Sequence, residues 1–402
     1  MRVLIYAPSA IIGGVEVWSF TYFRQLMQQG IATILFSAEP GVLVDSLSIT
    51  EKRYLVVGSF AELICYLKYN QVDVVHFPSQ AIDDGAGFIK KLFPKIKVIV
   101  TCHGAIPTGW SSNNCDQIIS CAAWLSCSAS VIAGVNVPHI CNGVDEKSFH
   151  FNHEIANPER PILLWVGRAD DPVKNFVLFL TLVDDIKALG MDIWVVSATT
   201  KEQLAENNLE GVMGKIDKWL SLSYGEMAYV YQYTASSGGA LLMTSLREGL
   251  PMVAIEAQAC GCPLVGPSHS GIFDAQINKQ LLFHSLDNKI EILEKINEVI
   301  NRTNEINTFG EALSLKTIKK FSVEKMSFAY LESYKIQEVV RSKVTLFEKF
   351  KRFITILKYE NIYFRKNIFN SLQLVISNLK QSNERDLAQK LRLIQYKYLI
   401  FK

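Results

Sequence analysis

Two glutamates in one short stretch of the chain are placed to bind a polar ligand. Glu248 and Glu256 lie within residues 245–271, SLREGLPMVAIEAQACGCPLVGPSHSG, and seven residues separate them. The apolar residues 239–243 before them predict a buried strand, and after Pro251 small and apolar residues recur at helical spacing. We therefore expect Glu248 in the loop at the strand's carboxyl end and Glu256 about one to two turns into the helix. Such a turn is where open parallel sheets bind ligands, and the N–H groups of the first helical turn favour an anion.

The chemistry of a carboxylate narrows the kind of ligand. A carboxylate repels phosphate but pairs well with sugar hydroxyls, so one of the two glutamates could hold a ribose and the other a second sugar. Together with the anion-binding turn, this is the layout that a nucleotide-sugar site needs. Two solvated glutamates that complement the dipole at the start of a helix would have the same spacing. The spacing alone does not separate these two interpretations.

Glycines and cations elsewhere in the chain suit phosphate groups. Gly13 and Gly14 follow a predicted strand at residues 2–6 and precede a predicted helix at residues 15–29, where glycine lets a phosphate approach the backbone closely. Arg168 and Lys174 follow a predicted strand at residues 161–166, and their side chains suit a diphosphate. A tight turn would also explain the glycines, and solvated surface positions would also explain the two cations.

One histidine is predicted to lie beside these groups. His103 follows the apolar residues 98–102 and precedes Gly104, so it is expected at the carboxyl end of a strand. A lone histidine is more often structural than functional. His76 also ends a predicted strand, and there a packing and hydrogen-bonding role is favoured.

Alternating strands and helices must position these residues. Further strands are predicted at residues 32–37, 54–57, 72–77, 96–102, 117–120, 124–127, 193–197 and 281–283, with helices at 60–68, 86–92, 176–189, 227–234 and 290–302. Alternation of this kind indicates parallel sheets that helices cover on both faces. The length of 402 residues suggests two domains or three small ones.

The stretch around the two glutamates resembles the E-x7-E signature of retaining glycosyltransferases of family four. The match extends through EAQACGCP at residues 256–263, which is similar to the family's EAMACGxPVV run, and on to residues 270–271. Weaker matches span about residues 1–336. They are Gly13-Gly14 with Glu16 (GGxE), residues 101–104 (HG or HD), residues 141–145 (PNGVD, with Cys141 in place of Pro), Gly167-Arg168 with Lys174 (GR…KG, with Asn175 in place of Gly) and residues 321–334 (the closing helix).

The resemblance implies an α/β fold of two facing Rossmann-like domains, the GT-B architecture. Residues 1–145 would form the N-terminal, acceptor-side domain, residues 146–160 the linker, residues 161–336 the nucleotide-sugar-binding domain, and residues 337–402 a basic, amphipathic helical extension.

The resemblance also assigns roles to residues. It implies that Glu256 accepts hydrogen bonds from the ribose hydroxyls and that Glu248 binds a hydroxyl of the transferred sugar. The backbone N–H groups of Gly249 and Leu250 would position that sugar and the phosphate. Arg168 and Lys174 would bind the diphosphate, Gly13 and Gly14 would approach the phosphates, and His103 would lie beside the transferred sugar. The anomeric configuration would be retained, with no metal and no cofactor, and the departing phosphate would take the acceptor's proton.

The composition indicates the cellular compartment in which the protein is expected. The chain has eight cysteines, none in a CxxC pair, which fits reduced thiols in a cytoplasmic protein and offers no metal-ligand spacing. No run of eighteen or more apolar residues appears, so no transmembrane helix is predicted. The short apolar start, interrupted by Pro8, is interpreted as a strand and not as a signal peptide.

The C-terminal segment differs from the rest of the chain. Residues 341–402 carry fourteen Lys and Arg against four Asp and Glu, whereas the chain as a whole has a net charge of +2. Apolar and basic residues interleave there at helical spacing, which suits an interfacial anchor on an anionic membrane. A helical hairpin that packs on the protein or on another subunit would show the same pattern. No nucleic-acid-binding motif is present.

The expected function is therefore a retaining glycosyltransferase of the hexosyl- or N-acetylhexosaminyltransferase class. It would use a UDP- or GDP-sugar and a saccharide or lipid-linked saccharide acceptor, in bacterial surface polysaccharide or lipopolysaccharide synthesis. A non-catalytic nucleotide-sugar-binding subunit and a nucleotide-sugar epimerase of similar fold remain as alternatives. A Rossmann-type oxidoreductase would need G-x-G-x-x-G after the first strand, and Gly13-Gly14 does not supply it.

Overall fold

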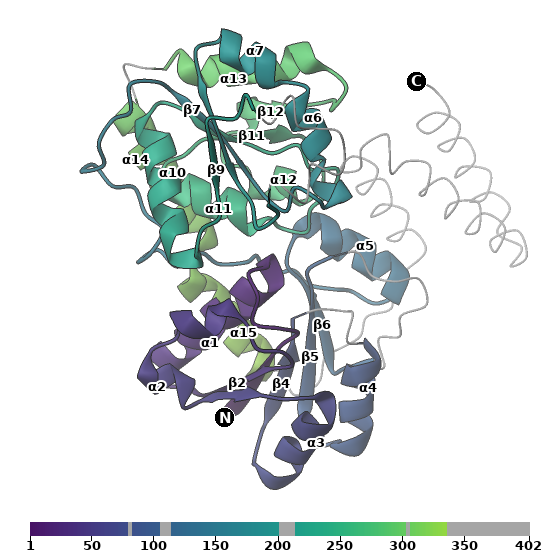
Figure 1. The fold of residues 1–402 in the computed structure, drawn as a ribbon. Helices are drawn as coiled ribbons and strands as arrows, with labels where there is room; N and C mark the ends of the chain where they lie inside the picture. Colours follow the sequence, from purple (N-terminus) through teal and green to yellow (C-terminus); the bar gives the residue numbers. More distant parts are fainter. Residues whose placement is uncertain (79–82, 105–113, 201–213, 303–305, 336–402) are drawn as a thin grey trace, which may run out of the picture.

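The computed structural model describes residues 1–78, 83–104, 114–200, 214–302 and 306–335. Within them the chain forms two parallel six-stranded sheets, each with helices packed around it (Figure 1). This confirms the prediction of two α/β domains. The C-terminal extension predicted at residues 337–402 lies outside the described residues.

The N-terminal sheet has the strand order β3-β2-β1-β4-β5-β6. Its order changes direction beside β1, so the carboxyl ends of β1 and β4 lie next to each other at the switch point, where sheets of this kind bind ligands. The strands are β1 (Arg2–Ala7), β2 (Ala32–Ser37), β3 (Leu55–Val57), β4 (Val74–Phe77), β5 (Lys97–Cys102) and β6 (Gln117–Ser120). The helices of this half are α1 (Gly14–Gln28), η1 (Val42–Ser46), α2 (Ile49–Lys52), α3 (Phe60–Tyr69), α4 (Asp83–Leu92) and α5 (Ala123–Ala133).

The C-terminal sheet has the order β12-β11-β10-β7-β8-β9, and its switch point lies beside β7. The strands are β7 (Ile162–Val166), β8 (Asp192–Val196), β9 (Lys218–Leu220), β10 (Ala240–Leu242), β11 (Leu264–Pro267) and β12 (Leu282–Phe283). The helices are η4 (Pro172–Lys174), α6 (Phe176–Leu180), α7 (Val183–Ala188), η5 (Tyr224–Glu226), α10 (Met227–Ser236), α11 (Met252–Ala259), α12 (Ser270–Ala275), η6 (Lys279–Leu281), α13 (Lys289–Ile300), α14 (Ile306–Phe321) and α15 (Val323–Lys335).

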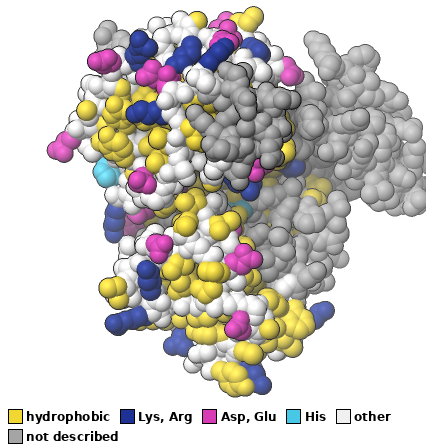
Figure 2. All heavy atoms as spheres, viewed as in Figure 1, with side chains coloured by type: hydrophobic (Ala, Val, Ile, Leu, Met, Phe, Trp, Pro, Cys, Tyr) yellow, Lys and Arg dark blue, Asp and Glu magenta, His cyan; other side chains and the backbone are white. Residues whose placement is uncertain are grey.

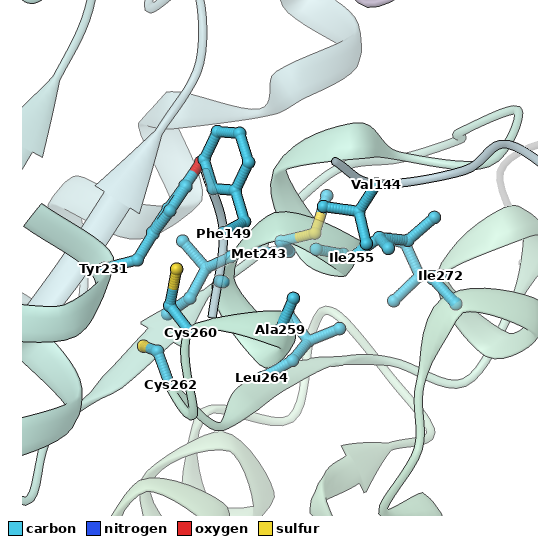
Figure 3. Packing of buried hydrophobic residues seen from close by; sticks show 14 of the residues in the cluster. Val144, Phe149, Tyr231, Met243, Ile255, Ala259, Cys260, Cys262, Leu264 and Ile272 are labelled. Carbon is cyan, nitrogen blue, oxygen red and sulfur yellow. The ribbon is translucent and has the colours of Figure 1, made fainter. Parts of the chain in front are cut away.

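Apolar side chains from both faces of each sheet form the cores. In the C-terminal domain one cluster packs α10 and α11 against the sheet, and Figure 3 shows Tyr231, Met243, Ile255 and Leu264 meeting there. A second cluster, which includes Trp165 and residues of α6, α7 and α13, covers the opposite face. On the molecular face drawn in Figure 2, acidic and basic side chains lie interspersed over both domains.

The helix α15 packs on the N-terminal domain, although the sequence analysis grouped residues 161–336 together. Met326, Tyr330 and Tyr334 are buried in the same cluster as β1 and α1. The Tyr334 hydroxyl lies 3.0 Å from that of Tyr22 and 2.5 Å from Nδ1 of His76. The chain therefore crosses between the domains twice, and a backbone bridge between Val144 and Ser322 joins the two crossings.

Two of the expected elements differ in the structure. Residues 124–127 were predicted as a strand, but they lie in α5, where Leu125 and Ala129 are buried one turn apart. A short apolar run fits both periodicities, which explains the error. The helix expected at residues 176–189 is divided into α6 and α7.

No helix in the described ranges is both long and apolar enough to cross a membrane.

Candidate functional site

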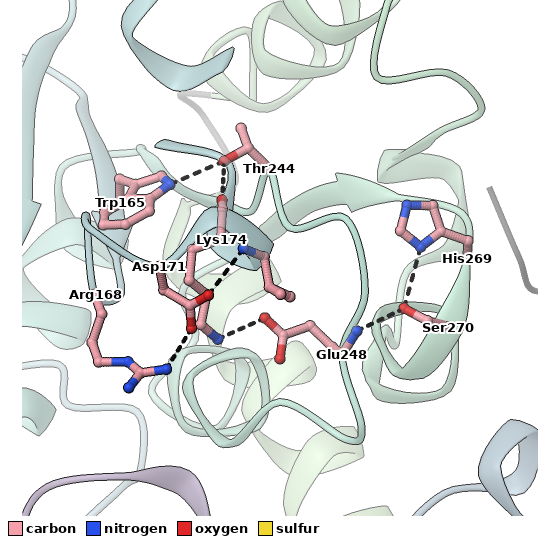
Figure 4. A network of polar contacts seen from close by, with 9 residues as sticks. Trp165, Arg168, Asp171, Lys174, Thr244, Glu248, His269 and Ser270 are labelled. Carbon is pink, nitrogen blue, oxygen red and sulfur yellow. Dashed lines mark hydrogen bonds and ion pairs between the residues drawn. The ribbon is translucent and has the colours of Figure 1, made fainter. Parts of the chain in front are cut away.

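Glu248 follows β10 and forms an ion pair with Lys174, which ends η4. The Nζ–Oε1 distance is 2.7 Å, and the side chains are 11% and 23% exposed. The main chain of Lys174 is held in place as well, because Thr244 Oγ1 donates to its carbonyl at 2.9 Å and Trp165 Nε1 donates to Thr244 Oγ1 at 3.1 Å (Figure 4). The ammonium group of Lys174 and the carboxylate of Glu248 are thus fixed together at the carboxyl edge of the sheet.

Arg168 follows β7 and reaches the same edge. Its guanidinium bonds Asp171 at 2.5 Å but stays 66% exposed. Asp171 is itself fixed, because Oδ1 accepts a hydrogen bond from the N–H of Val173 at 2.9 Å and so caps η4. An exposed ion pair of this kind contributes about 1 kcal/mol or less, so the guanidinium can be redirected to a ligand at little cost.

The backbone of Glu248 rests on the start of α12. Its N–H donates to Ser270 Oγ at 3.1 Å, and Ser270 Oγ lies 3.2 Å from Nδ1 of His269 (Figure 4). The N–H of Gly271 donates to the Glu248 carbonyl at 3.1 Å. Ser270 has a φ of 50°, a left-handed conformation that costs a residue other than glycine of order 1–3 kcal/mol. Such strain persists only where the surroundings impose it, which marks this loop as a constrained part of the molecule.

The N-terminal domain holds the turn after Glu248. Trp124 Nε1 donates to the carbonyl of Gly249 at 2.8 Å, and Asn142 Nδ2 donates to that of Leu250 at 3.2 Å. A Cβ on Gly249 would lie 2.0 Å from the carbonyl oxygen of His103, so this approach requires glycine. Among the described residues, no backbone carbonyl accepts from the N–H of Gly249 or Leu250, but the N–H of Leu250 is hydrogen-bonded to the sulfur of Cys121. Both donors lie just before α11, whose N-terminus favours an anion.

Glu256 lies on α11 and is 3% exposed. The Tyr224 hydroxyl donates to its Oε1 at 3.2 Å. Burial raises the pKa of Glu256 to about 7, and the hydrogen bond from Tyr224 opposes that rise. A buried carboxylate with so perturbed a pKa is typical of functional sites.

The glycines of the N-terminal domain lie at the start of α1. Gly13 is the N-cap residue of this fifteen-residue helix and Gly14 is its first residue. A Cβ on Gly14 would meet nothing within 4 Å, whereas one on Gly13 would lie 2.4 Å from Oε2 of Glu16, so the Glu16 carboxylate lies against the start of the helix. Glu16, in the first turn, has a pKa that burial raises and that the positive charge of Arg168 lowers. Arg168 of the C-terminal domain therefore faces the glycine loop of the N-terminal domain.

His103 follows β5 and lies against the Glu248 turn through its backbone. Its Nε2 atom is buried with no hydrogen-bond partner in the part of the chain that the structure describes. Burial lowers the pKa of His103 to about 3, so the imidazole is neutral at physiological pH. An unpartnered buried nitrogen is costly and points to a missing partner. His76, in contrast, bonds Tyr334 and Thr101 through its two ring nitrogens, as suits a packing residue.

Lys174, Arg168 and the two helix starts supply positive potential at the site. The described residues include no group of three or more His, Cys, Asp or Glu that could hold a metal ion.

Four residues of the site were not singled out from the sequence: Trp124, Asn142, Tyr224 and Ser270. Asn142 and Ser270 lie inside matched motifs, so the motifs contained a signal that was not used. Trp124 and Tyr224 lie in segments without a motif. The contact between the two domains brings Trp124 to the site, whereas Tyr224 reaches Glu256 within the C-terminal domain.

Comparison with known proteins agrees with this arrangement. A family model described as "Glycosyl transferases group 1" matches residues 146–313. No sequence among curated proteins matches the chain.

Several solved structures share the fold. A glycosyltransferase from Rickettsia africae is 19% identical, with a TM-score of 0.69 over 83% of this chain and 97% of that one. Sucrose-phosphate synthase from Thermosynechococcus elongatus is 14% identical, with a TM-score of 0.66 over 83% and 98%. The HepE protein from Anabaena, in complex with UDP-glucose, is 16% identical, with a TM-score of 0.66 over 83% and 99%. These likenesses confirm the GT-B fold.

Proposed function

We propose that the protein is a retaining glycosyltransferase that moves a sugar from a nucleotide-sugar donor to a saccharide or lipid-linked saccharide acceptor. The observation that carries the proposal is the arrangement around α11. Two carboxylates, Glu248 and Glu256, lie on either side of the N–H groups of Gly249 and Leu250, and Lys174 is bonded to the first of them. Carboxylates suit sugar hydroxyls, and the cation and the helix start suit the diphosphate between two sugars.

The donor would lie across the edge of the C-terminal sheet. Glu256 would accept from the ribose hydroxyls and Glu248 from a hydroxyl of the transferred sugar. Lys174 and Arg168 would bind the diphosphate, with the N-terminus of α1 at Gly13 and Gly14 closing from the opposite domain. A donor with a diphosphate fits both the family model and the Anabaena structure of the same fold, whose ligand is UDP-glucose.

The chemical step in this proposal depends on charge stabilisation. As the bond from the anomeric carbon to the diphosphate breaks, negative charge grows on the leaving oxygen. Lys174 would stabilise it, and the Arg168 guanidinium would turn from Asp171 to do the same; charges held in a site in this way lower a barrier. The departing phosphate takes the proton of the acceptor hydroxyl. His103 is neutral, so its Nε2 would orient a hydroxyl of the transferred sugar.

Binding of nucleotide diphosphates tests the proposal. Thermal unfolding would be followed with UDP-, GDP- and ADP-sugars for the wild type and for Lys174→Met. A ligand present at about a hundred times its Kd stabilises by about 2.7 kcal/mol, which gives a readable shift. Lys187→Met is the matched control, because Lys187 also pairs with a carboxylate, that of Asp217, away from the site.

We expect one donor to raise the midpoint in the wild type and in Lys187→Met but not in Lys174→Met. Equal shifts in all three proteins, or no shift with any nucleotide, would refute the proposal. Donor binding without release of free sugar or transfer to any acceptor would favour the non-catalytic subunit instead.

The acceptor and the location are part of the same proposal. The basic residues 341–402 would attract the anionic inner surface of a bacterial membrane, where lipid-linked saccharides of surface polysaccharide synthesis are available, and the free cysteines suit the cytoplasm. Deletion of residues 341–402 should release the protein from anionic vesicles. Equal sedimentation of the full and truncated chains would contradict this part.

A further inference from the structure

Tyr224 lies where the two domains and the segment between them meet. It begins η5, and its ring packs against the hydrophobic core of the N-terminal domain as well as that of the C-terminal domain. Its ring centroid is 5.4 Å from that of Phe149, in the segment between the two sheets. Figure 3 shows Phe149 beside Tyr231 at the edge of the C-terminal core. Tyr224 thus contacts both domains and the segment between them.

The hydroxyl of Tyr224 is the middle of a hydrogen-bonded chain. The Thr21 hydroxyl, on α1 of the N-terminal domain, bonds the oxygen of Tyr224. The Tyr224 hydroxyl in turn donates to Glu256 Oε1 at 3.2 Å. Thr21 is 5% exposed, so this chain crosses from one domain to the other away from bulk water.

From this geometry, and resting on the proposed function, we propose that Tyr224 is a positioning residue for the donor ribose. Its hydroxyl holds the Glu256 carboxylate in place as an acceptor, and its bond to Thr21 ties that carboxylate to the approach of the N-terminal domain. Tyr224 itself need not touch the donor, because it acts through Glu256.

The electrostatics around Glu256 explain why this carboxylate needs a hydrogen-bond donor beside it. An ionised carboxylate can accept hydrogen bonds from both adjacent hydroxyls of a ribose. A protonated carboxyl group is itself a hydrogen-bond donor at one oxygen and so accepts less well from the pair. Burial favours the protonated form and raises the pKa of Glu256 to about 7, and the hydrogen bond from Tyr224 acts in the opposite direction.

The other titratable groups that face Glu256 supply no positive charge. They are Tyr231 from α10 and Cys260 from the end of α11, and burial raises the pKa of both, so they stay neutral. Asp145 faces Tyr224 and raises the pKa of its phenol, which keeps that hydroxyl a donor. The hydroxyls of Tyr224 and Tyr231 therefore both favour the ionised form of the carboxylate, and that of Tyr224 donates to it at 3.2 Å.

The expected behaviour follows from the direction of these effects. Nucleotide affinity should fall as the pH is lowered through about 7, because Glu256 takes up a proton. Tyr224→Phe keeps the ring and its packing but removes the donor, so the pKa of Glu256 rises further. The midpoint of the affinity profile should then move to higher pH, and the Kd at neutral pH should rise about tenfold or more, as for the loss of one hydrogen bond to a charged group.

The experiment measures the Kd of UDP, GDP and ADP by calorimetry from about pH 5.5 to 8.5, where a carboxylate of raised pKa titrates. It compares the full-length wild type, Tyr224→Phe and Thr21→Val. Tyr229→Phe is the matched control, because Tyr229 lies on the next helix and is 56% exposed. We expect the control to follow the wild type, and Thr21→Val to shift the midpoint in the same direction as Tyr224→Phe by a smaller amount.

Two results would overturn the inference. One is a Tyr224→Phe profile that coincides with that of Tyr229→Phe. The other is a loss of affinity that is equal at every pH, which a purely structural role would produce. If the wild type binds no nucleotide, the proposed function fails. The pH dependence of the unfolding free energy still reports the titration of Glu256 in that case, and an unchanged midpoint in Tyr224→Phe would then reject the inference separately.

Discussion

Replacing Glu256 by Gln should make the protein less sensitive to pH and more stable above neutrality. The folded protein holds the proton of Glu256 with a pKa of about 7, because the side chain is buried, whereas an unfolded glutamate titrates near ~4.3. At about 1.36 kcal/mol for each unit of pKa, this difference corresponds to roughly 3.7 kcal/mol.

The sign follows from linkage. The folded state binds the proton more tightly, so this contribution to stability is fully present below about pH 4 and is lost as the pH rises to about 7. A Gln side chain has nearly the same shape and does not titrate. The free energy of unfolding of Glu256→Gln, relative to the wild type, should therefore increase by up to about 3.7 kcal/mol between these limits.

Urea unfolding at a series of pH values measures this difference. Glu62→Gln is a control of opposite sign, because hydrogen bonds from Ser59 lower the pKa of the exposed Glu62 carboxylate. The contribution of Glu62 to the free energy of unfolding is therefore lost as the pH falls. A difference between Glu256→Gln and the wild type that stays constant across the pH range would refute the buried, proton-binding state of Glu256 described above.

Three further substitutions test the turn that carries Glu248. Ser270→Gly removes both the left-handed strain and the hydroxyl, whereas Ser270→Ala removes only the hydroxyl. Chemical unfolding should therefore find the Ala variant less stable than the Gly variant by about 1 kcal/mol. Equal stabilities would show that the backbone of Ser270 is not strained. Gly249→Ala places a Cβ 2.0 Å from the carbonyl oxygen of His103, and a loss of more than about 2 kcal/mol of stability, together with weaker nucleotide binding, is expected. Trp124→Phe removes the donor to the Gly249 carbonyl and should cost about 1 kcal/mol; an unchanged unfolding midpoint would show that this bond contributes nothing.

Much of the fold could be predicted because the strands of parallel sheets are buried on both faces. Continuous apolar runs then mark them clearly, and β2 and β6 have the predicted bounds. The edge strand β9 has only three residues, none of them buried, and it was not predicted. The strand β11 was absorbed into the motif that follows Glu256, because LVGP is short and is flanked by glycine and proline.

The candidate site was predictable where a residue's neighbours in sequence are also its neighbours in space. Glu248, Gly249 and Glu256 share one strand–turn–helix unit, so their periodicity places them without knowledge of the rest of the fold. The ion pair between Lys174 and Glu248 was not predicted. It depends on β7 and β10 being adjacent in the sheet, which is a property of strand order.

The contacts between the domains could not be predicted, and they set the chemistry of the site. Polar groups of the two domains hydrogen-bond to each other. The indole N–H of Trp124 donates to the carbonyl of Gly249, and the side-chain amide of Asn142 donates to the carbonyl of Leu250. Because these bonds are made to backbone atoms, no pattern of side chains in the facing segment reveals them. Tyr224 bonds Glu256 within the C-terminal domain, and the same contact brings Thr21 to it, so that an ordinary tyrosine outside any motif acts on the charge of a buried carboxylate. A motif thus identifies candidate ligand-binding groups, whereas their protonation state depends on neighbours that the motif does not contain.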